Sequence, residues 1–413
     1  MSTTRGSRLQ GLVGAFRGRR VLVIADLVAD EFVYGRVERI SREAPVLILR
    51  YDSTDVRLGG GANAIHNIAT LGGRPIPFGV LGRDEMGRTV RKQLKAKAIG
   101  TSRVVNEPGY ATPVKTRILA GRAHSTKQQI VRIDKVSTVG RPSPARRAVL
   151  QALRAYKGPV DGVLVSDYGF GLLSPELVKA AVAFARRRRV PVTVDSRFDL
   201  LRYRGMTAVT PNEPEVEAAL GVTIGHDRAK LEAGGRTLLE RLACQSVLIT
   251  RGSHGMTLLE RGRPTLHIPI HGTDEVADVT GAGDTVIATF TLALAAGATP
   301  AEASRLANYA GSVVVMKHAT AVVSSGELLA AVREGESRCE RPRPWWSPSR
   351  ACARTSRRPV ATGGPWPWPT AASTCFTWVT CATSRVPGRR PTFWWWASTA
   401  TDPSGASRGR AVR

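Results

Sequence analysis

Cysteine is nearly absent from the first 336 residues of this 413-residue chain, where Cys244 is the only one. This scarcity excludes a disulfide framework for that part and favours a reducing, cytoplasmic compartment. The chain also lacks a run of 18 apolar residues, so we expect no transmembrane helix and no membrane partner. The early apolar stretch Val21–Ala29 contains Asp26 and has no cleavage-like site, which predicts a first strand rather than a signal peptide.

Lysine is absent from residues 337–413, and tryptophan is absent from everything before them. The tail holds all eight Trp, four of the five Cys, 13 Arg and two acidic residues, so about +11 of the net charge of +27 lies there. A charge of +27 alone would indicate nucleic acid or an anionic surface as a partner. Its uneven distribution instead predicts one folded domain over residues 1–336 and an aberrant tail over 337–413.

The tail has the composition of a GC-rich gene translated out of frame. If Pro369–Ser384 is assigned G/C-rich codons and shifted back by one nucleotide, one permitted reading is ANGCFDLLHVGHVRYL; the same shift of Pro391–Asp402 permits ADVLVVGVNSD. This hidden text resembles a nucleotidyltransferase domain with its phosphate-binding HxGH motif, which the chain itself lacks at Thr377–Thr380. We expect residues 337–413 to be disordered and non-functional; the alternative is a genuine nucleic-acid-binding arm rich in Trp and Arg.

Short apolar runs alternate with helical stretches through the rest of the chain. Strands are predicted at Arg20–Ala25, Gly162–Ser166, Val190–Asp195, Thr207–Thr210 and Ser246–Thr250, and helices at Ser174–Arg188 and Asp227–Ala243. This alternation predicts an α/β fold of right-handed βαβ units on a mostly parallel sheet. Ligands of such sheets bind beyond the carboxyl ends of the strands, where this chain places Asp26, Asp30, Asp167, Asp195, Asn212 and Thr250.

Two segments interrupt this alternation. Residues 32–56 and 112–134 have the period-two pattern of β-strands and no helix of useful length between the strands. We expect them to form a small antiparallel β lid that covers a site on the main domain.

The most informative motif is Asp278-Val-Thr-Gly-Ala-Gly-Asp284-Thr285, which leads directly into an apolar helix. A small-residue turn at a helix N-terminus leaves backbone N–H groups free to bind an anion, here those of Gly281, Ala282 and Gly283. Asp284 could then accept a proton from a hydroxyl held beside that anion. Such an arrangement suits phosphoryl transfer to an alcohol; the plainer reading is a glycine-rich turn with an Asp cap.

Three further motifs follow strands or open helices. Gly59, Gly60 and Gly61 allow close approach of a ligand to the backbone, and Asn63 can bond a sugar hydroxyl, although a plain capped turn is equally compatible. Asn212 and Glu215 lie three residues apart on one face of a first helical turn, a spacing that also suits helix capping. The turn that contains Thr250, Gly252 and Gly255 could contact nucleotide phosphates, or be only a βα turn.

These motifs, in this order, resemble those of the PfkB/ribokinase family of carbohydrate kinases over about residues 18–333. Within that family the chain is most similar to the kinase half of bifunctional heptose 7-phosphate kinase/heptose 1-phosphate adenylyltransferases. The resemblance rests on Arg39–Val46, Gly59–Asn63, Asn67–Ala69, Ser166–Tyr168, Arg202–Gly205, Thr210–Asn212 and Asp278–Thr285. It implies a ribokinase-like three-layer sandwich, with ATP and Mg²⁺ as cofactors and a homodimer formed through the β lids.

The resemblance also implies a role for each candidate residue. Asp284 would be the base beside Gly281, Ala282 and Gly283, and Asp30, Gly59, Gly60 and Asn63 would hold the sugar. Asn212 and Glu215 would organise Mg²⁺ through water, while Thr250, Gly252, Gly255 and Asn308 would contact the nucleotide. Because a sugar phosphate needs cationic partners, Lys115, Arg117 and Arg132 are candidate anchors for it.

The implied reaction is phosphorylation of D-glycero-D-manno-heptose 7-phosphate at its anomeric hydroxyl, with no adenylyltransferase activity. The chain departs from the family pattern at Ala25-Asp26, where Gly-Asp is usual, and at Asp195-Ser196-Arg197, where Asp-Pro-Lys is usual. Three alternatives remain at this point: a PfkB kinase for another sugar, a frameshift-damaged pseudoenzyme, and a non-enzymatic basic protein that binds nucleic acid.

Overall fold

The computed structural model describes residues 3–121, 127–272 and 278–340. Its central sheet is parallel from β10 to β4, and β11 and β12 extend it antiparallel at one edge. The strand order is β12 (Leu266–Ile268), β11 (Met256–Glu260), β10 (Ser246–Thr250), β9 (Ala208–Val209), β8 (Val192–Ser196), β7 (Gly162–Asp167), β1 (Arg20–Ile40), β3 (Arg74–Leu81) and β4 (Val104–Asn106).

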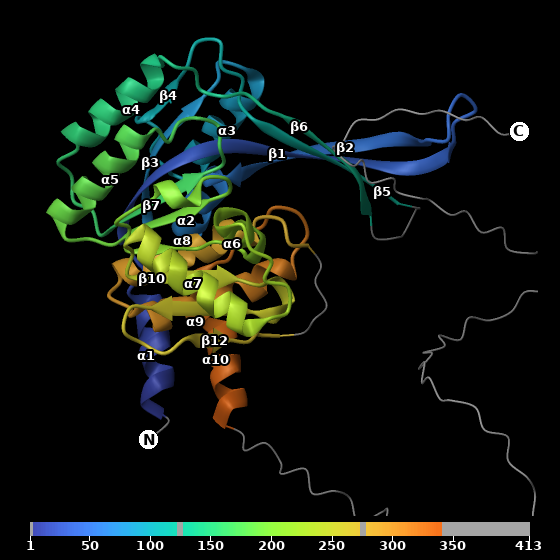
Figure 1. Ribbon diagram of the computed structural model, residues 1–413. Coiled ribbons are helices and arrows are strands. Elements are labelled where there is room, and N and C mark those ends of the chain that lie inside the picture. Colours follow the sequence, from blue (N-terminus) through green and yellow to red (C-terminus); the bar gives the residue numbers. More distant parts are fainter. Residues whose placement is uncertain (1–2, 122–126, 273–277, 341–413) are drawn as a thin grey trace, which may run out of the picture. The chain divides into compact units, whose positions relative to one another are not determined.

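Helices cover both faces of this sheet and complete three layers (Figure 1). Alternate residues of β1 enter different cores, Val21 and Val23 one and Leu22 and Ile24 the other, because successive strand side chains point to opposite faces. The first core is covered by α1 (Thr3–Gly14), α2 (Gly61–Thr70), α3 (Glu85–Ala96), α8 (Ala282–Ala295), α9 (Pro300–Val315) and α10 (Ser325–Glu340). The second is covered by α4 (Pro144–Ala155), α5 (Pro175–Arg188), α6 (Glu213–Leu220) and α7 (Arg228–Leu242).

The helix boundaries follow from local capping. Helix α5 begins after Ser174, whose hydroxyl accepts the N–H of Leu177, and it ends where Arg189 takes a left-handed conformation. The Asp227 carboxylate caps α7 in the same way. The helices predicted for these two segments are therefore confirmed.

Strand β1 is much longer than the predicted strand Arg20–Ala25. It continues to Ile40, leaves the main sheet, and pairs there with β2 (Leu47–Gly60) antiparallel and with β5 (Val114–Gly121) parallel. Strand β6 (Gln128–Lys135) completes the lid by pairing antiparallel with β5. The four strands project together from the main body in Figure 1. The lid is confirmed, with one parallel pairing between its two antiparallel hairpins.

Helix α10 extends to Glu340, beyond the domain boundary predicted at residue 336. The prediction for the remainder of the tail, 341–413, lies outside the described residues. Among the helices that are described, none is long and apolar enough to span a bilayer.

Candidate active site

The turn before α8 has a left-handed residue at a position that requires glycine. Gly281 caps the helix at φ 79°, and a Cβ placed there would lie 2.6 Å from the side-chain nitrogen of Asn63. Of the three amides predicted to bind an anion, that of Ala282 donates instead to the Val279 carbonyl at 3.2 Å. The amides of Gly281 and Gly283 have no partner among the described residues. One of the three predicted anion-binding donors, the Ala282 amide, is therefore already hydrogen-bonded in this structure.

Asp284 is buried at the start of α8, with 3% of its surface exposed. The Tyr168 hydroxyl donates to its Oδ1 at 2.6 Å, and Asn63 Nδ2 donates to its Oδ2 at 3.1 Å. Asn67 in turn donates to Asn63 Oδ1 at 3.2 Å, which turns the Asn63 amide nitrogen toward the carboxylate. Burial raises the pKa of Asp284 to about 6, although the hydrogen bonds from Tyr168 and Asn63 act to lower it.

Asp30 lies in β1, at the base of the lid, and is also 3% exposed. It accepts from Arg117 Nη1 at 2.9 Å and from the Thr320 hydroxyl at 2.6 Å. Gly59 is required beside it, because a Cβ at that position would come within 2.6 Å of the Asp30 carboxyl carbon. A Cβ at Gly60, which has φ 53°, would lie 2.9 Å from the Val28 side chain and 3.2 Å from the Tyr168 ring. Asp30, Gly59, Gly60 and Asn63 therefore lie close to the Asp284 assembly.

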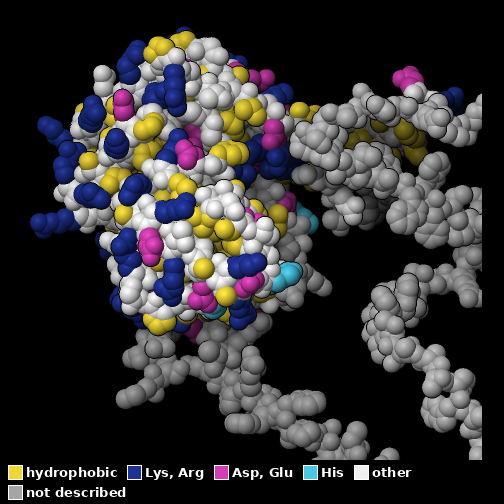
Figure 2. Space-filling view, viewed as in Figure 1, with side chains coloured by type: hydrophobic (Ala, Val, Ile, Leu, Met, Phe, Trp, Pro, Cys, Tyr) yellow, Lys and Arg dark blue, Asp and Glu magenta, His cyan; other side chains and the backbone are white. Residues whose placement is uncertain are grey.

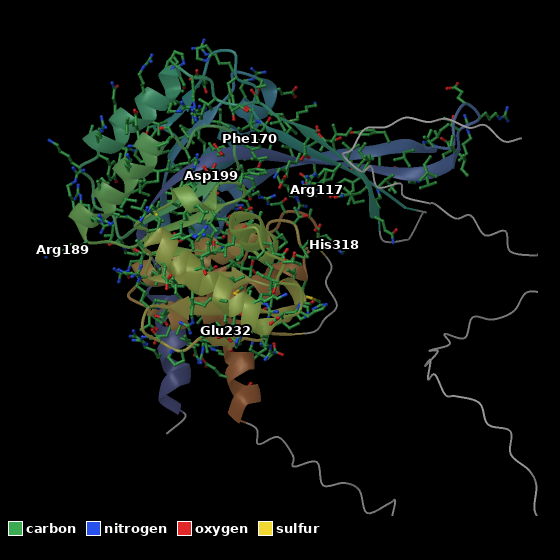
Figure 3. All side chains as sticks on the ribbon, viewed as in Figure 1. Arg117, Phe170, Arg189, Asp199, Glu232 and His318 are labelled. Carbon is green, nitrogen blue, oxygen red and sulfur yellow. The ribbon has the colours of Figure 1, made fainter. Side chains whose placement is uncertain are left out.

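The three cations predicted as phosphate anchors have different surroundings. Arg117 forms a buried ion pair with Asp30, and Figure 3 shows it where the lid meets the body. Arg132 lies on the exposed strand β6, where it pairs with Asp134 at 2.8 Å. Only the Lys115 ammonium is aimed at the Asp284 region, 4.6 Å from the centre of the Tyr168 ring. In this structure Arg117 and Arg132 are paired with the carboxylates of Asp30 and Asp134. The spacing of residues along the sequence could not reveal these ion pairs.

Arg197, from the turn after β8, lies 4.5 Å from the centre of the same Tyr168 ring. Burial and the charge of Arg197 lower the pKa of Lys115 to about 8. The pKa of Asp195 is raised by burial and by the nearby carboxylates of Glu215 and Asp284. Two cations and several carboxylates thus converge on Tyr168 from the lid and from the main sheet.

Asn212 and Glu215 form a reciprocal capping box at the start of α6. Asn212 N–H donates to Glu215 Oε2 at 2.9 Å, and Glu215 N–H donates to Asn212 Oδ1 at 2.8 Å. The capping alternative therefore describes their arrangement here, and burial raises the pKa of Glu215. The described residues contain no cluster of three or more His, Cys, Asp or Glu side chains suited to holding a metal directly.

The predicted nucleotide contacts lie around two cavities whose lining does not include Asp284. A cavity of about 370 Å³ is lined by Arg251, Ser253 and His254, within the turn that carries Gly252 and Gly255. An adjoining cavity of about 420 Å³ is lined by Asn308, whose amide donates to the Pro269 carbonyl at 2.8 Å. Thr250 joins Asn212 through a parallel β-bridge, which links this turn to the start of α6.

Sequence reasoning missed two side chains that complete the assembly. Tyr168 was part of a noted pattern, Ser166–Tyr168, but carried no assigned role, and Thr320 carried no signal at all. The sequence places Asp26 at a strand end and in the Ala25-Asp26 departure from the family pattern, but gives it no role; its carboxylate accepts the N–H groups of Tyr168 and Phe170 at 2.9 and 3.1 Å. Its pKa is raised to about 7 by burial and by neighbouring Asp167.

Among solved structures, the fold of this chain is similar to those of a ribokinase and a phosphofructokinase. It superposes on Arabidopsis thaliana ribokinase complexed with ribose and ATP with a TM-score of 0.59, 18% identity, and coverage of 76% of this chain and 99% of that one. Phosphofructokinase-2 from Escherichia coli in complex with potassium gives a TM-score of 0.60, 17% identity, and coverage of 78% and 100%. At this identity the likeness shows the fold.

Sequence comparison shows the family. The profile described as pfkB family carbohydrate kinase matches residues 20–325, and the chain belongs to this family. Among curated relatives, Bifunctional protein HldE from Geobacter sulfurreducens is 41% identical over 312 residues, 75% of this chain and 62% of its own length. The protein of the same name from Caulobacter vibrioides is 39% identical over 329 residues, 79% and 66% respectively. The chain thus spans less than two thirds of the length of these relatives, over the half that the PfkB motifs occupy.

Proposed function

We propose that this carbohydrate kinase transfers the γ-phosphoryl group of ATP to the anomeric hydroxyl of D-glycero-D-manno-heptose 7-phosphate, giving the 1,7-bisphosphate used in ADP-heptose biosynthesis. The observation that carries the proposal is the Asp284 carboxylate, held by Tyr168 and Asn63 next to the Gly281 and Gly283 amides, which have no partner in the described part of the chain. Heptose is favoured over other sugars by the resemblance of Arg39–Val46 and by the similarity to the HldE proteins.

Asp284 is the proton acceptor in this mechanism. With a pKa of about 6 it is mostly ionised at neutral pH, and it can take the proton of an acceptor hydroxyl, which contributes about 10²–10⁴-fold in rate. The amides of Gly281 and Gly283 stabilise negative charge on the group in transfer. Asp30, Gly59, Gly60 and Asn63 orient the sugar, and the lid excludes water that would compete as acceptor.

The phosphate already on the sugar needs cationic partners. Lys115 and Arg197 suit this role better than Arg117 and Arg132, because neither forms an ion pair within the described part of the chain and both lie against Tyr168. A phosphate between them would offset the repulsion that lowers the pKa of Lys115. We therefore assign the anchor role to Lys115 and, in place of the family lysine, to Arg197.

ATP would lie over the turn of Thr250, Gly252 and Gly255, with its base toward Asn308. Mg²⁺ would supply charge neutralisation of the phosphates, which is its usual role in phosphoryl transfer. The carboxylates of Glu215 and Asp195 fit such a cation, because their mutual repulsion raises the pKa of Asp195 and oxygen is the ligand type that Mg²⁺ prefers. Asn212 and Glu215 would act through water, since the capping bonds engage the Asn212 amide oxygen and one of the two Glu215 carboxylate oxygens.

The decisive experiment is a coupled assay of ADP release with a panel of sugars, with and without a 7-phosphate. We expect turnover with heptose 7-phosphate and little with unphosphorylated sugars. Asp284→Asn should abolish turnover and spare ATP binding, whereas Asp199→Asn, at an exposed loop position, should leave both unchanged. Near-normal kcat in Asp284→Asn would refute the role of Asp284. Preference for another sugar would refute heptose 7-phosphate as the substrate.

The lid carries apolar side chains that face solvent in one copy of the chain, which supports a homodimer through the lids. They are 43–66% exposed and comprise Ile40, Val46, Leu47, Tyr51, Ile130, Val131, Ile133 and Val136. Light scattering of the intact chain and of Ile133→Asp tests this: a monomeric wild type, or an Ile133→Asp variant that is as dimeric as the wild type, would contradict it.

Adenylyltransferase activity should be missing, since the chain has no HxGH motif in its own frame. Resequencing the gene across codons 330–345 tests the frameshift, and an intact frame there would contradict it. Residues 1–336 still carry about +16, but on the face in Figure 2 Lys and Arg are spread over the surface with acidic side chains between them, which is unlike the single basic patch expected of a nucleic-acid-binding protein.

A further inference from the structure

Tyr168 is built into the site from three directions. Its backbone N–H donates at 2.9 Å to the carboxylate of Asp26, the last β1 residue that pairs with β3 in the main sheet. Its ring is packed against Gly60 and lies near Lys115 and Arg197. Only 5% of its surface is exposed, so the hydroxyl has little freedom to seek another partner.

The Tyr168 hydroxyl donates its hydrogen bond to Asp284. It donates at 2.6 Å to Oδ1, a short bond of the kind formed between a hydroxyl and a charged carboxylate. Burial and the charge of Asp284 raise the pKa of Tyr168 well above 10, so the phenol keeps its proton and remains a donor. The hydrogen bond that Asn63 donates to the other oxygen of Asp284 is longer, at 3.1 Å.

Other charged groups around Asp284 oppose one another. Arg197 from the turn after β8 and Lys115 from β5 favour its ionised form, whereas Asp30 from β1 and Asp195 from β8 disfavour it. Desolvation of the buried carboxylate is the largest effect and also disfavours the charge. Within the described residues, Tyr168 and Asn63 donate the hydrogen bonds that offset it.

We propose that Tyr168 is a positioning residue that fixes the carboxylate of Asp284 and keeps it in the ionised form that can accept the proton of the sugar hydroxyl. This inference rests on the proposed function, in which Asp284 is the base. The Tyr168 proton stays on the phenol throughout, and the proton that moves passes from the acceptor hydroxyl to Asp284.

The test is Tyr168→Phe, which keeps the ring against Lys115, Arg197 and Gly60 and removes only the donor. In the wild type, kcat/KM should fall below about pH 6 as Asp284 becomes protonated. Loss of a hydrogen bond to a charged group should move this acid limb upward by about one to two pH units. At pH 7 the variant should then be slower by about two- to tenfold, and at pH 9 it should recover most of the wild-type rate.

Tyr203→Phe is the matched control, because Tyr203 is a buried tyrosine that donates to Asp167 and does not contact Asp284. Its acid limb should coincide with that of the wild type. The proposal is overturned if Tyr168→Phe keeps the wild-type limb, loses activity equally at pH 7 and pH 9, or shifts no more than the control.

A second readout separates this inference from the proposed function. In protein labelled with ¹³C at the aspartate carboxyls, the Asp284 resonance can be assigned by its loss in Asp284→Asn. Its titration midpoint should rise in Tyr168→Phe even if no sugar is phosphorylated. If the wild type phosphorylates no sugar but the Asp284 midpoint still rises in Tyr168→Phe, only the proposed function is refuted. If the midpoint does not rise in Tyr168→Phe, the role of Tyr168 is refuted.

Discussion

The buried ion pair between Arg117 and Asp30 gives the sharpest prediction about stability. Both partners are more than nine-tenths buried, and the bond from Arg117 Nη1 to Asp30 Oδ1 is 2.9 Å long. In Arg117→Met the Asp30 charge would keep only the Thr320 hydroxyl as a donor. Removing one partner of a buried pair typically costs about 3–5 kcal/mol, because the remaining charge is desolvated and uncompensated. The Met side chain would preserve apolar packing against Phe32, which lies under the guanidinium.

Urea unfolding of the full chain measures this cost, and the lid supplies its own control. Arg132 and Asp134 form a similar pair that faces solvent, so Arg132→Met should cost only about 0–1 kcal/mol. The double variant Asp30→Asn/Arg117→Met should be more stable than Arg117→Met, because the unpaired charge is gone. Equal losses in the two single variants, or a double variant less stable than Arg117→Met, would refute the reasoning.

Three further variants probe the site and its supports. Gly59→Ala should raise the KM for the sugar and leave the KM for ATP unchanged, because its Cβ would press on Asp30 at a cost of about 1–3 kcal/mol. Gly14→Ala is the control and should be neutral, since a Cβ at Gly14 would meet nothing within 4 Å. Steady-state kinetics of both variants measures the effect. Lys115→Met should raise the KM for the phosphorylated sugar, and the wild-type KM should itself rise as the pH passes about 8 and Lys115 loses its charge; an unchanged KM in the variant would exclude Lys115 as the anchor. Asp84→Ala should destabilise the fold by about 1–2 kcal/mol at pH 7, because its carboxylate caps α3 at Gly87 and binds the Thr112 amide. Burial alone would raise the pKa of Asp84, but these amides outweigh it and lower the pKa, so its contribution is full above the unfolded value of about 3.9 and is lost as the pH falls through the folded value. Urea midpoints that stay equally far apart from pH 7 to pH 2 would contradict this.

The sequence by itself determined the family, the alternating βα order and the position of Asp284, because these depend on local patterns: apolar periodicity, helix caps and a glycine turn that only one backbone conformation satisfies. The same local information predicted Asn212 and Glu215 as neighbours, and the capping box is the local reason. Amino-acid composition alone also distinguished residues 1–336 from residues 337–413, with no information on tertiary contacts.

Only the tertiary structure decided which charged residues find a partner far away in the chain. Arg117 and Arg132 are alike in sequence, yet one lies against Asp30 and the other in solvent, because β5 faces the body and β6 forms the outer edge of the lid. Likewise Tyr168 reaches Asp284 across 116 positions of the chain. Such pairings follow from how the strands and helices pack, and no spacing along one chain encodes them.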